Sequence, residues 1–201
     1  MAIIVVGLNH RTTPVEIREK LALSGLALQI ALEDLRVASL PQQGTAAPID
    51  EAVILSTCNR LEIYISTHQR DEGIALVEQF LSGLQNISQA DLKAHLYHRV
   101  GDDAVQHLMR VSCGLDSMIL GETQILGQVT QAYEDARNAG MTGSILSHLF
   151  AQVIHTGKRA RTETPISRYT TSVSHASALL LMDKLNQRRT ARVVIIGAGE
   201  M

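Results

Sequence analysis

The stretch VILSTCNRLEIYI, residues 53–65, places a cysteine between two strongly apolar runs. Cys58 follows Thr57 and precedes Asn59 and Arg60, so its neighbours are polar on both sides. The thiolate is the nucleophilic form of cysteine, and the guanidinium two residues away could favour it because that group stays charged at any ordinary pH. The Thr57 hydroxyl and the N–H groups of a turn suit an oxyanion. These residues permit a cysteine nucleophile, although spacing alone favours the alternative of a structural cysteine.

Cys113 provides a contrast, because it lies near the end of an amphipathic helical pattern, one residue before Gly114. A packed small residue is the simpler interpretation there, and we assign it no chemistry. His107, in the same helical stretch, is the best candidate for a proton-transfer partner, since a leaving alkoxide needs an acid with a pKa near neutrality. It lies beside an apolar stripe, so a structural role is the alternative. The chain has 8 histidines, and spacing does not choose among them.

A row of glutamines follows Glu122 along one expected helix. Gln124, Gln128 and Gln131 recur at spacings of four and three, which places them on a shared helix face. Together with Ser117, which lies just before this helix, the row could bind the ammonium and carboxylate groups of an amino-acid substrate. A helix side that simply faces solvent is the alternative.

The formal net charge of −2 provides no overall attraction for nucleic acid. The stretch GKRARTETPISR, residues 157–168, is nevertheless locally basic. Its cations are Lys158, Arg159, Arg161 and Arg168. The segment could hold a few phosphates, or it could be a solvated helix end whose cations lie near the last carbonyl groups.

The cysteine content and hydropathy pattern argue against several protein classes. The 2 cysteines match no CxxC or His/Cys ligand spacing, so neither a disulfide framework nor a metal site is predicted. A reduced, cytoplasmic setting fits this usage best. The apolar runs are too short for a signal peptide or a membrane span, and no membrane association is expected.

The first hundred residues predict an α+β unit with a small, mostly antiparallel sheet in the order β-α-β-β-α-β. Short β-branched or alternating apolar runs predict the strands, which cover residues 2–8, 52–56, 61–66 and 94–100. Helical periodicity and Pro14 predict helices that begin at residue 14 and cover 26–38 and 73–84. We expect residues 1–100 to form the catalytic subdomain, with the cysteine in a tight connection between its second and third strands.

From residue 101 the pattern is helical almost throughout, with helices expected over 101–114, 121–140, 144–161 and 170–187. Residues 101–188 are therefore expected to form a helical part that completes the substrate site. The end of the chain, ARVVIIGAGEM, is a β-branched run that enters Gly-x-Gly, which is typical of a dinucleotide-binding strand and phosphate turn. The helix that would hold the pyrophosphate does not follow. We expect residues 189–201 to be the truncated start of a Rossmann domain in a longer protein.

Four stretches together resemble one enzyme family. GLNHRTTPVEIRE, STCNRLEIY, HLMRVSCGLDSMILGETQILGQV and KRARTET are similar to glutamyl-tRNA reductase, the first committed enzyme of the five-carbon route to tetrapyrroles. The similarity covers essentially the entire chain. STCNR and LGETQILGQV are its most specific parts.

The resemblance implies that Cys58 attacks the ester carbonyl of glutamate carried on its tRNA, giving an enzyme thioester and free tRNA. NADPH then reduces the thioester to glutamate-1-semialdehyde, on the way to 5-aminolevulinate and haem. His107 matches the activity-supporting histidine of the family. The matching substrate contacts are Thr57, Asn59, Arg60, Ser117, Glu122, Thr123, Gln124 and Gln128. The start of the NADPH site matches Gly197, Ala198, Gly199, Glu200 and Met201.

The chain departs from the family pattern at its end, because family members continue with a complete NADPH domain and a helical dimerisation domain. This chain is therefore expected to form or hydrolyse the thioester, but neither to bind NADPH nor to reduce the thioester. The full-length form is expected to be a homodimer, with glutamate-1-semialdehyde aminomutase as a candidate partner. The alternatives are a non-catalytic tRNA or partner-binding module and a stand-alone thiol hydrolase of small esters.

Overall fold

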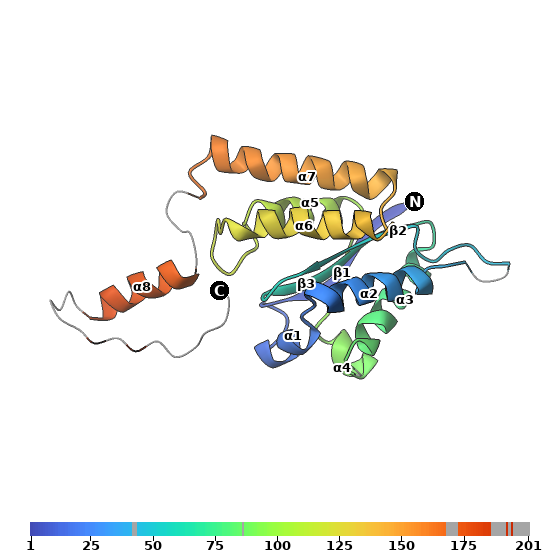
Figure 1. Ribbon diagram of the computed structural model, residues 1–201, viewed down its shortest axis with the longest axis horizontal. Coiled ribbons are helices and arrows are strands. Elements are labelled where there is room, and N and C mark those ends of the chain that lie inside the picture. The colour runs from blue at the N-terminus through green and yellow to red at the C-terminus, as the bar shows by residue number, and fades with distance from the viewer. Residues whose placement is uncertain (42–43, 86, 168–172, 186–191, 193, 195–201) are drawn as a thin grey trace.

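The computed structural model describes residues 1–41, 44–85, 87–167, 173–185, 192 and 194. Its sheet has four antiparallel strands in the spatial order β2-β3-β1-β4 (Figure 1). The strands are β1 (Ala2–Asn9), β2 (Glu51–Ser56), β3 (Arg60–Thr67) and β4 (Tyr97–Val100). The α+β prediction is confirmed, including the edge position of the last strand.

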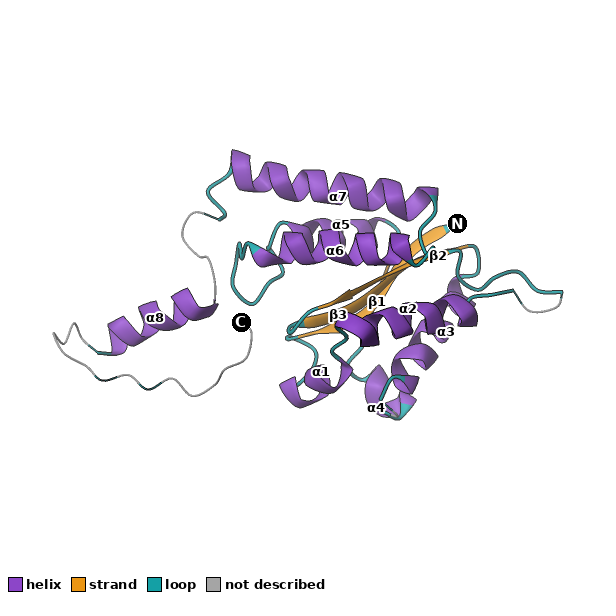
Figure 2. Cartoon of the chain, viewed as in Figure 1, coloured by secondary structure: helices purple, strands orange, loops and turns teal. Residues whose placement is uncertain are grey.

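Helices cover both faces of this sheet. Those in the first part of the chain are α1 (Val15–Leu21), α2 (Gly25–Ala38), α3 (Arg70–Gly83) and α4 (Gln89–Lys93). Those that follow β4 are α5 (Asp102–Ser112), α6 (Gln124–Asn138), α7 (Ser144–Glu163) and α8 (Val173–Lys184). Figure 2 shows α2 and α3 on one side of the sheet and α5, α6 and α7 on the other, with α8 apart from both layers.

The central strands are enclosed on both faces. In β1, six consecutive residues from Ile4 to Asn9 are buried, as the β-branched run AIIVV predicts. All eight residues of β3 are buried, although their apolar and polar side chains alternate. The polar members of β3 therefore lie inside the protein, where each needs a hydrogen-bond partner.

A carboxylate from the sheet holds the beginning of α7. Glu51, the first residue of β2, accepts the backbone N–H groups of Ile145 at 3.0 Å and Leu146 at 2.7 Å. A Cβ atom at Gly143 would lie 2.7 Å from the same carboxylate, so the absence of a side chain permits this approach. The first N–H groups of a helix lack acceptors within the helix, and the Glu51 carboxylate is the acceptor for two of them. This contact attaches the helical layer to the edge of the sheet.

The sheet and the helices that follow it share one core. Side chains from β1 and β3 belong to the same buried cluster as those of α5, α6 and α7. Within this cluster, the ring of Phe150 meets Tyr64 edge-on at 5.8 Å and stacks on Tyr133 at 5.7 Å. Helices α5, α6 and α7 are thus packed against the sheet that contains β3, the strand that follows Cys58.

The end of the chain falls largely outside the described residues. The expected fourth helix of the second part is present as α8, whereas the expected final strand is described only at Arg192 and Val194. The Rossmann start therefore stays a prediction, as does the division of the chain into domains. Within the part of the chain that is described, no helix combines the length and the hydropathy needed to cross a membrane.

Candidate active site

Cys58 lies in the short connection between β2 and β3, and it is exposed. The backbone N–H of Thr57 donates to the carbonyl of Arg60 at 2.8 Å, which closes the turn. The Thr57 hydroxyl oxygen accepts the N–H groups of Asn59 at 3.1 Å and Arg60 at 3.2 Å. A short polar side chain thus organises the turn in the way that threonine favours locally. The tight connection predicted from the sequence is present, and its cysteine faces solvent. Cys113, in contrast, is 7% exposed.

Helix α1 and the connection between β1 and α1 hold this turn in place. Arg18 donates through Nη1 to the carbonyl oxygen of Cys58 at 2.7 Å and to Oδ1 of Asn59 at 3.0 Å. The backbone N–H of His10 donates to the carbonyl of Asn59 at 2.9 Å. The cysteine turn is therefore fixed by residues that are distant in the sequence.

Arg60 points into the protein and is 2% exposed. Its guanidinium donates through Nη1 to Glu62, and through Nη2 to the backbone oxygen of Asp116 at 2.7 Å and to the Asp116 carboxylate at 3.2 Å. The arginine that was expected to favour the thiolate is thus bonded to two buried carboxylates. The guanidinium that contacts the Cys58 residue belongs to Arg18.

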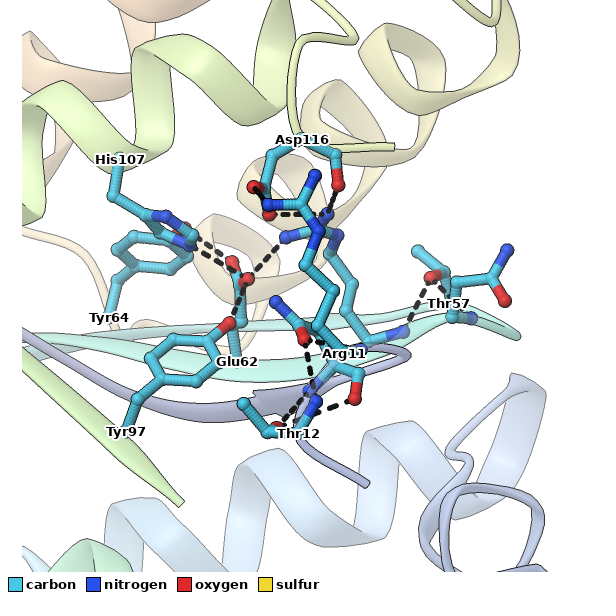
Figure 3. A network of polar contacts seen from close by, with 11 residues as sticks. Arg11, Thr12, Thr57, Glu62, Tyr64, Tyr97, His107 and Asp116 are labelled. Carbon is cyan, nitrogen blue, oxygen red and sulfur yellow. Dashed lines mark hydrogen bonds and ion pairs between the residues drawn. The ribbon is translucent and has the colours of Figure 1, made fainter. Parts of the chain in front are cut away.

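Glu62 is the centre of this buried network (Figure 3). Its carboxylate is fully buried and accepts hydrogen bonds from Arg60, from the hydroxyl groups of Tyr64 and Tyr97, and from Nε2 of His107 at 2.9 Å. Burial alone would raise the pKa of Glu62, but the charge of Arg60 and the hydrogen bonds from His107 and Tyr64 hold that pKa well below its usual range. The carboxylate is consequently ionised at neutral pH.

The two phenols act as hydrogen-bond donors to this carboxylate. Burial, followed by the negative charge of Glu62, raises the pKa of Tyr64 and of Tyr97 well above the usual value. Both hydroxyl groups therefore keep their protons at neutral pH. They satisfy lone pairs of Glu62 that would otherwise be buried without partners.

His107 belongs to the same network and is 4% exposed. Besides its hydrogen bond to Glu62, its ring meets the ring of Tyr97 edge-on at 5.5 Å. The sequence indicated a histidine beside an apolar stripe, and the structure adds an acidic partner that fixes its orientation. Because Nε2 is engaged by Glu62, the other ring nitrogen is the one free to meet a ligand. A role in proton transfer stays a prediction.

The loop between α5 and α6 carries a second part of the candidate site. Gly114 and Gly121 have φ angles of +73° and +79°, and Gly121 donates its N–H to the Gly114 carbonyl at 2.9 Å, which closes the loop. A Cβ atom at Gly121 would lie 2.0 Å from the backbone oxygen of Ile166. The closed loop holds Asp116 against Arg60, and Arg11 reaches the other oxygen of Asp116 at 3.1 Å.

Two polar atoms near this network lack partners. In the described part of the chain, Oγ of Ser117 and Nδ1 of His10 are buried without a hydrogen-bond partner, and a third such atom, Oγ of Ser66, lies near the other end of β3. Burial and the charge of Arg11 lower the pKa of His10, so this ring is neutral at pH 7 and can accept a hydrogen bond. Unsatisfied buried polar atoms are costly, and a bound polar ligand could satisfy both.

The predicted glutamine row lies on α6, beyond the loop that contains Ser117. Gln124 and Gln131 are exposed and Gln128 is half-buried. Gln131 also donates to Asp135 at 2.9 Å along the helix surface. Glu122 is half-buried and Thr123 is exposed, immediately before α6. The structure thus places these residues at the beginning and on the outer side of one helix, as the spacing indicated.

One cation of the basic segment, Arg161, is engaged within the protein, whereas Lys158 and Arg159 are exposed. Arg161 donates to the backbone oxygens of Ser112 at 2.8 Å and Glu122 at 3.2 Å, so it joins the two ends of the α5–α6 loop to α7. Arg159 pairs with Glu163 at 2.8 Å on the helix surface. Arg168 lies outside the described residues.

Sequence reasoning missed six residues of the network and the cysteine turn: Arg11, Arg18, Glu62, Tyr64, Tyr97 and Asp116. One signal was available for Glu62, because a charged residue in the apolar stretch LEIYI is costly to bury and requires a partner. The others give no local signal. Arg60 and Asp116 are separated by 56 residues in the sequence.

The described residues contain no group of three or more histidine, cysteine or acidic side chains that could hold a metal ion. The residues expected to begin the NADPH site, Gly197, Ala198, Gly199, Glu200 and Met201, lie outside the described part. The structure therefore gives no geometry for a cofactor.

Comparisons with known proteins agree with the resemblance seen in the motifs. The family model for the glutamyl-tRNAGlu reductase N-terminal domain matches residues 6–164. Over its whole length, the chain is 47% identical to the glutamyl-tRNA reductase of Pelotomaculum thermopropionicum and 45% identical to that of Cyanophora paradoxa. It covers 44% and 45% of those two proteins.

A solved structure is also similar. Glutamyl-tRNA reductase from Methanopyrus kandleri matches with a TM-score of 0.67 and 31% identity, over 90% of this chain and 40% of that chain. The chain therefore spans less than half the length of the relatives it matches. The family model covers residues 6–164, and the relatives align with the chain from end to end. This chain belongs to the glutamyl-tRNA reductase family.

Proposed function

We propose that this chain performs the acyl-transfer half of glutamyl-tRNA reduction, with Cys58 as the nucleophile. One observation carries the proposal: Cys58 is exposed at the tip of a turn whose backbone is fixed by Thr57 and Arg18. An exposed sulfur on a fixed turn can meet an activated acyl group, whereas the buried Cys113 cannot.

The reaction forms one bond and breaks another. The Cys58 thiolate adds to the ester carbonyl carbon of glutamate on its tRNA, and the bond from that carbon to the ribose oxygen then breaks. The products are a thioester and a tRNA hydroxyl, so the leaving alkoxide must gain one proton. We assign the supply of this proton to His107, which Glu62 orients from the buried side at 2.9 Å.

The remaining predicted residues are proposed to bind the glutamyl group and the acceptor end of the tRNA. Ser117 supports this role best, since its buried hydroxyl has no protein partner among the described residues. Arg60 is proposed to act from beneath the site by holding Glu62 and Asp116 in place, because its nitrogens are bonded to both carboxylates. The other proposed contacts are Thr57, Asn59, Glu122, Thr123, Gln124 and Gln128.

We propose that reduction of the thioester, the second half of the reaction, takes place in a longer protein that includes this chain. NADPH, when bound there, supplies the hydride that converts the thioester to the aldehyde. The residues expected to begin its site lie outside the described part, so no role of the described residues depends on it. A cytoplasmic homodimer, with the aminomutase as partner, is likewise proposed for the longer protein only.

The acyl-transfer proposal is tested by incubating the 201-residue chain with glutamyl-tRNA and trapping the acyl-enzyme. Glutamate should be recovered on the Cys58 peptide, and Cys58→Ser should abolish both this adduct and tRNA deacylation. Cys113→Ser is the matched control and should retain both. Deacylation by Cys58→Ser at the original rate would contradict the assignment. Addition of NADPH should give no semialdehyde.

The alternative is a non-catalytic tRNA-binding module that depends on the basic segment 157–168. Arg161 is bonded within the protein and Arg159 pairs with Glu163, so fewer unpaired positive charges remain for a tRNA backbone. The acyl-transfer proposal is therefore favoured over the binding module. Iodoacetamide distinguishes the two proposals. The enzyme requires fast alkylation of Cys58 that glutamyl-tRNA protects, whereas the module predicts slow alkylation that tRNA does not change.

A further inference from the structure

Arg18 lies on α1 and reaches a turn that is 40 residues away in the sequence. Its Nη1 atom donates to the Cys58 carbonyl at 2.7 Å and to the Asn59 side-chain oxygen at 3.0 Å. On the same guanidinium, Nε donates to the Thr13 carbonyl at 3.2 Å. The planar group thus joins α1 and the segment before it to the turn that carries the cysteine.

These hydrogen bonds have a specific consequence for Cys58. Its side chain is exposed, so packing against neighbours does little to set the direction of the sulfur. The backbone at residue 58 instead fixes the Cβ atom and restricts the χ1 rotamers that the sulfur can adopt. Thr57 fixes the N–H that follows Cys58 in the chain, and Arg18 fixes its carbonyl oxygen. The same peptide group, between residues 58 and 59, is therefore held from both ends.

We propose that Arg18 is a positioning residue that aims the Cys58 sulfur at its acyl substrate. The inference rests on the proposed acyl transfer. Thiolate attack needs the sulfur about 3–3.5 Å from the carbonyl carbon and in line with it, and a misplacement of about 1 Å can reduce the rate roughly a hundredfold. Arg18 does not touch the reacting atoms. It acts through the peptide group of Cys58.

A purely structural role for Arg18, in which it only fastens α1 to the sheet, makes different predictions. Loss of such a role would loosen the fold around both cysteines. Loss of positioning would reduce acylation of Cys58 and leave the buried Cys113 protected. Cys113 is only 7% exposed, so its labelling by iodoacetamide would report a loosened fold.

The test compares Arg18→Ala, Arg18→Lys and the control Arg36→Ala in the 201-residue chain. Arg36 is a matched control because it pairs with Glu33 on α2, outside the network. Single-turnover acylation of Cys58 is measured with glutamyl-tRNA and with p-nitrophenyl acetate, whose phenolate is displaced by the sulfur. Each rate is measured with and without about 50 mM guanidinium chloride, far below the molar concentrations that unfold proteins.

Arg18→Ala should slow acylation by both donors at least tenfold, and added guanidinium should recover a several-fold part of the loss. Arg18→Lys should remain nearly as slow as Arg18→Ala, because an ammonium cannot replace donation from Nε and Nη1 together. Arg36→Ala should match the original chain. Iodoacetamide should leave Cys113 unlabelled in every variant.

Two outcomes overturn the inference: an unchanged rate in Arg18→Ala, or a loss that guanidinium does not recover. The second outcome, especially with labelling of Cys113, assigns Arg18 a structural role. Failure of the proposed function gives a different result. In that case glutamyl-tRNA does not acylate even the unsubstituted chain, while p-nitrophenyl acetate still reports the effect of Arg18.

Discussion

Glu62 and His107 meet inside the protein although 45 residues separate them, with Nε2 of the histidine 2.9 Å from Oε1 of the glutamate. The pair links β3, which begins immediately after the cysteine turn, to α5 in the helical layer. Arg60 shares the same carboxylate, so one buried charge orients both a cation and an imidazole. Such an arrangement holds groups in place before a substrate arrives.

Glu62→Gln should destabilise the protein strongly. The substitution keeps the shape of the side chain but removes the charge that pairs with the buried Arg60, and breaking a buried pair costs about 3–5 kcal/mol. We expect the free energy of unfolding in urea to fall by about that amount. Glu33→Gln breaks the exposed pair with Arg36 and should cause no measurable change. Equal effects of the two substitutions would contradict the central role of Glu62.

The same carboxylate should make stability sensitive to acid. The pKa of Glu62 is lower in the folded protein than its ordinary value of 4.5, so the unfolded chain binds the proton more readily. Its contribution is complete above that ordinary value and is lost as the pH falls below it. Urea unfolding between pH 6 and pH 3 should show this loss, and a Glu62→Gln protein should show a shallower decline. Parallel curves for the two proteins would exclude Glu62 as a source of the pH dependence.

Glu51→Ala should loosen the beginning of α7. Two backbone N–H groups, of Ile145 and Leu146, would lose their acceptor, and loss of a helix cap costs about 1–2 kcal/mol. We expect a lower free energy of unfolding and faster hydrogen exchange at these two amides. Glu72→Ala, an exposed position in the first turn of α3, is the control and should leave both measurements unchanged.

Gly121→Ala should disturb the α5–α6 loop, because its Cβ would lie 2.0 Å from the Ile166 backbone oxygen and its φ angle is +79°. Clash and backbone strain together should cost about 3 kcal/mol, and acylation of Cys58 should fall because Asp116 and Ser117 shift. Gly140→Ala has a similar φ of +69° and nothing within 4 Å. It should cost only about 1 kcal/mol and leave acylation unchanged. If Gly140→Ala proves as damaging as Gly121→Ala, contact with Ile166 is not the cause.

The fold was largely predictable because its signals are local. The β-branched run of β1 and the alternation in β3 gave strands at the observed places, and helical periodicity gave α5, α6 and α7 within a few residues. The alternation in β3 also suggested one polar face. That face is buried, because α5, α6 and α7 cover it and polar partners meet Glu62 there.

The amino-acid sequence alone determined the kind of turn that presents Cys58, since Thr57 organises its neighbours through bonds that span two or three residues. Only the tertiary structure decided which groups surround that turn. Arg18, Glu62 and Asp116 become partners of Cys58, His107 and Arg60 through contacts across 40 to 56 residues of chain. The physical reason is that a buried charge is stable only where packing brings a counter-charge to it, and spacing along the chain does not record that position.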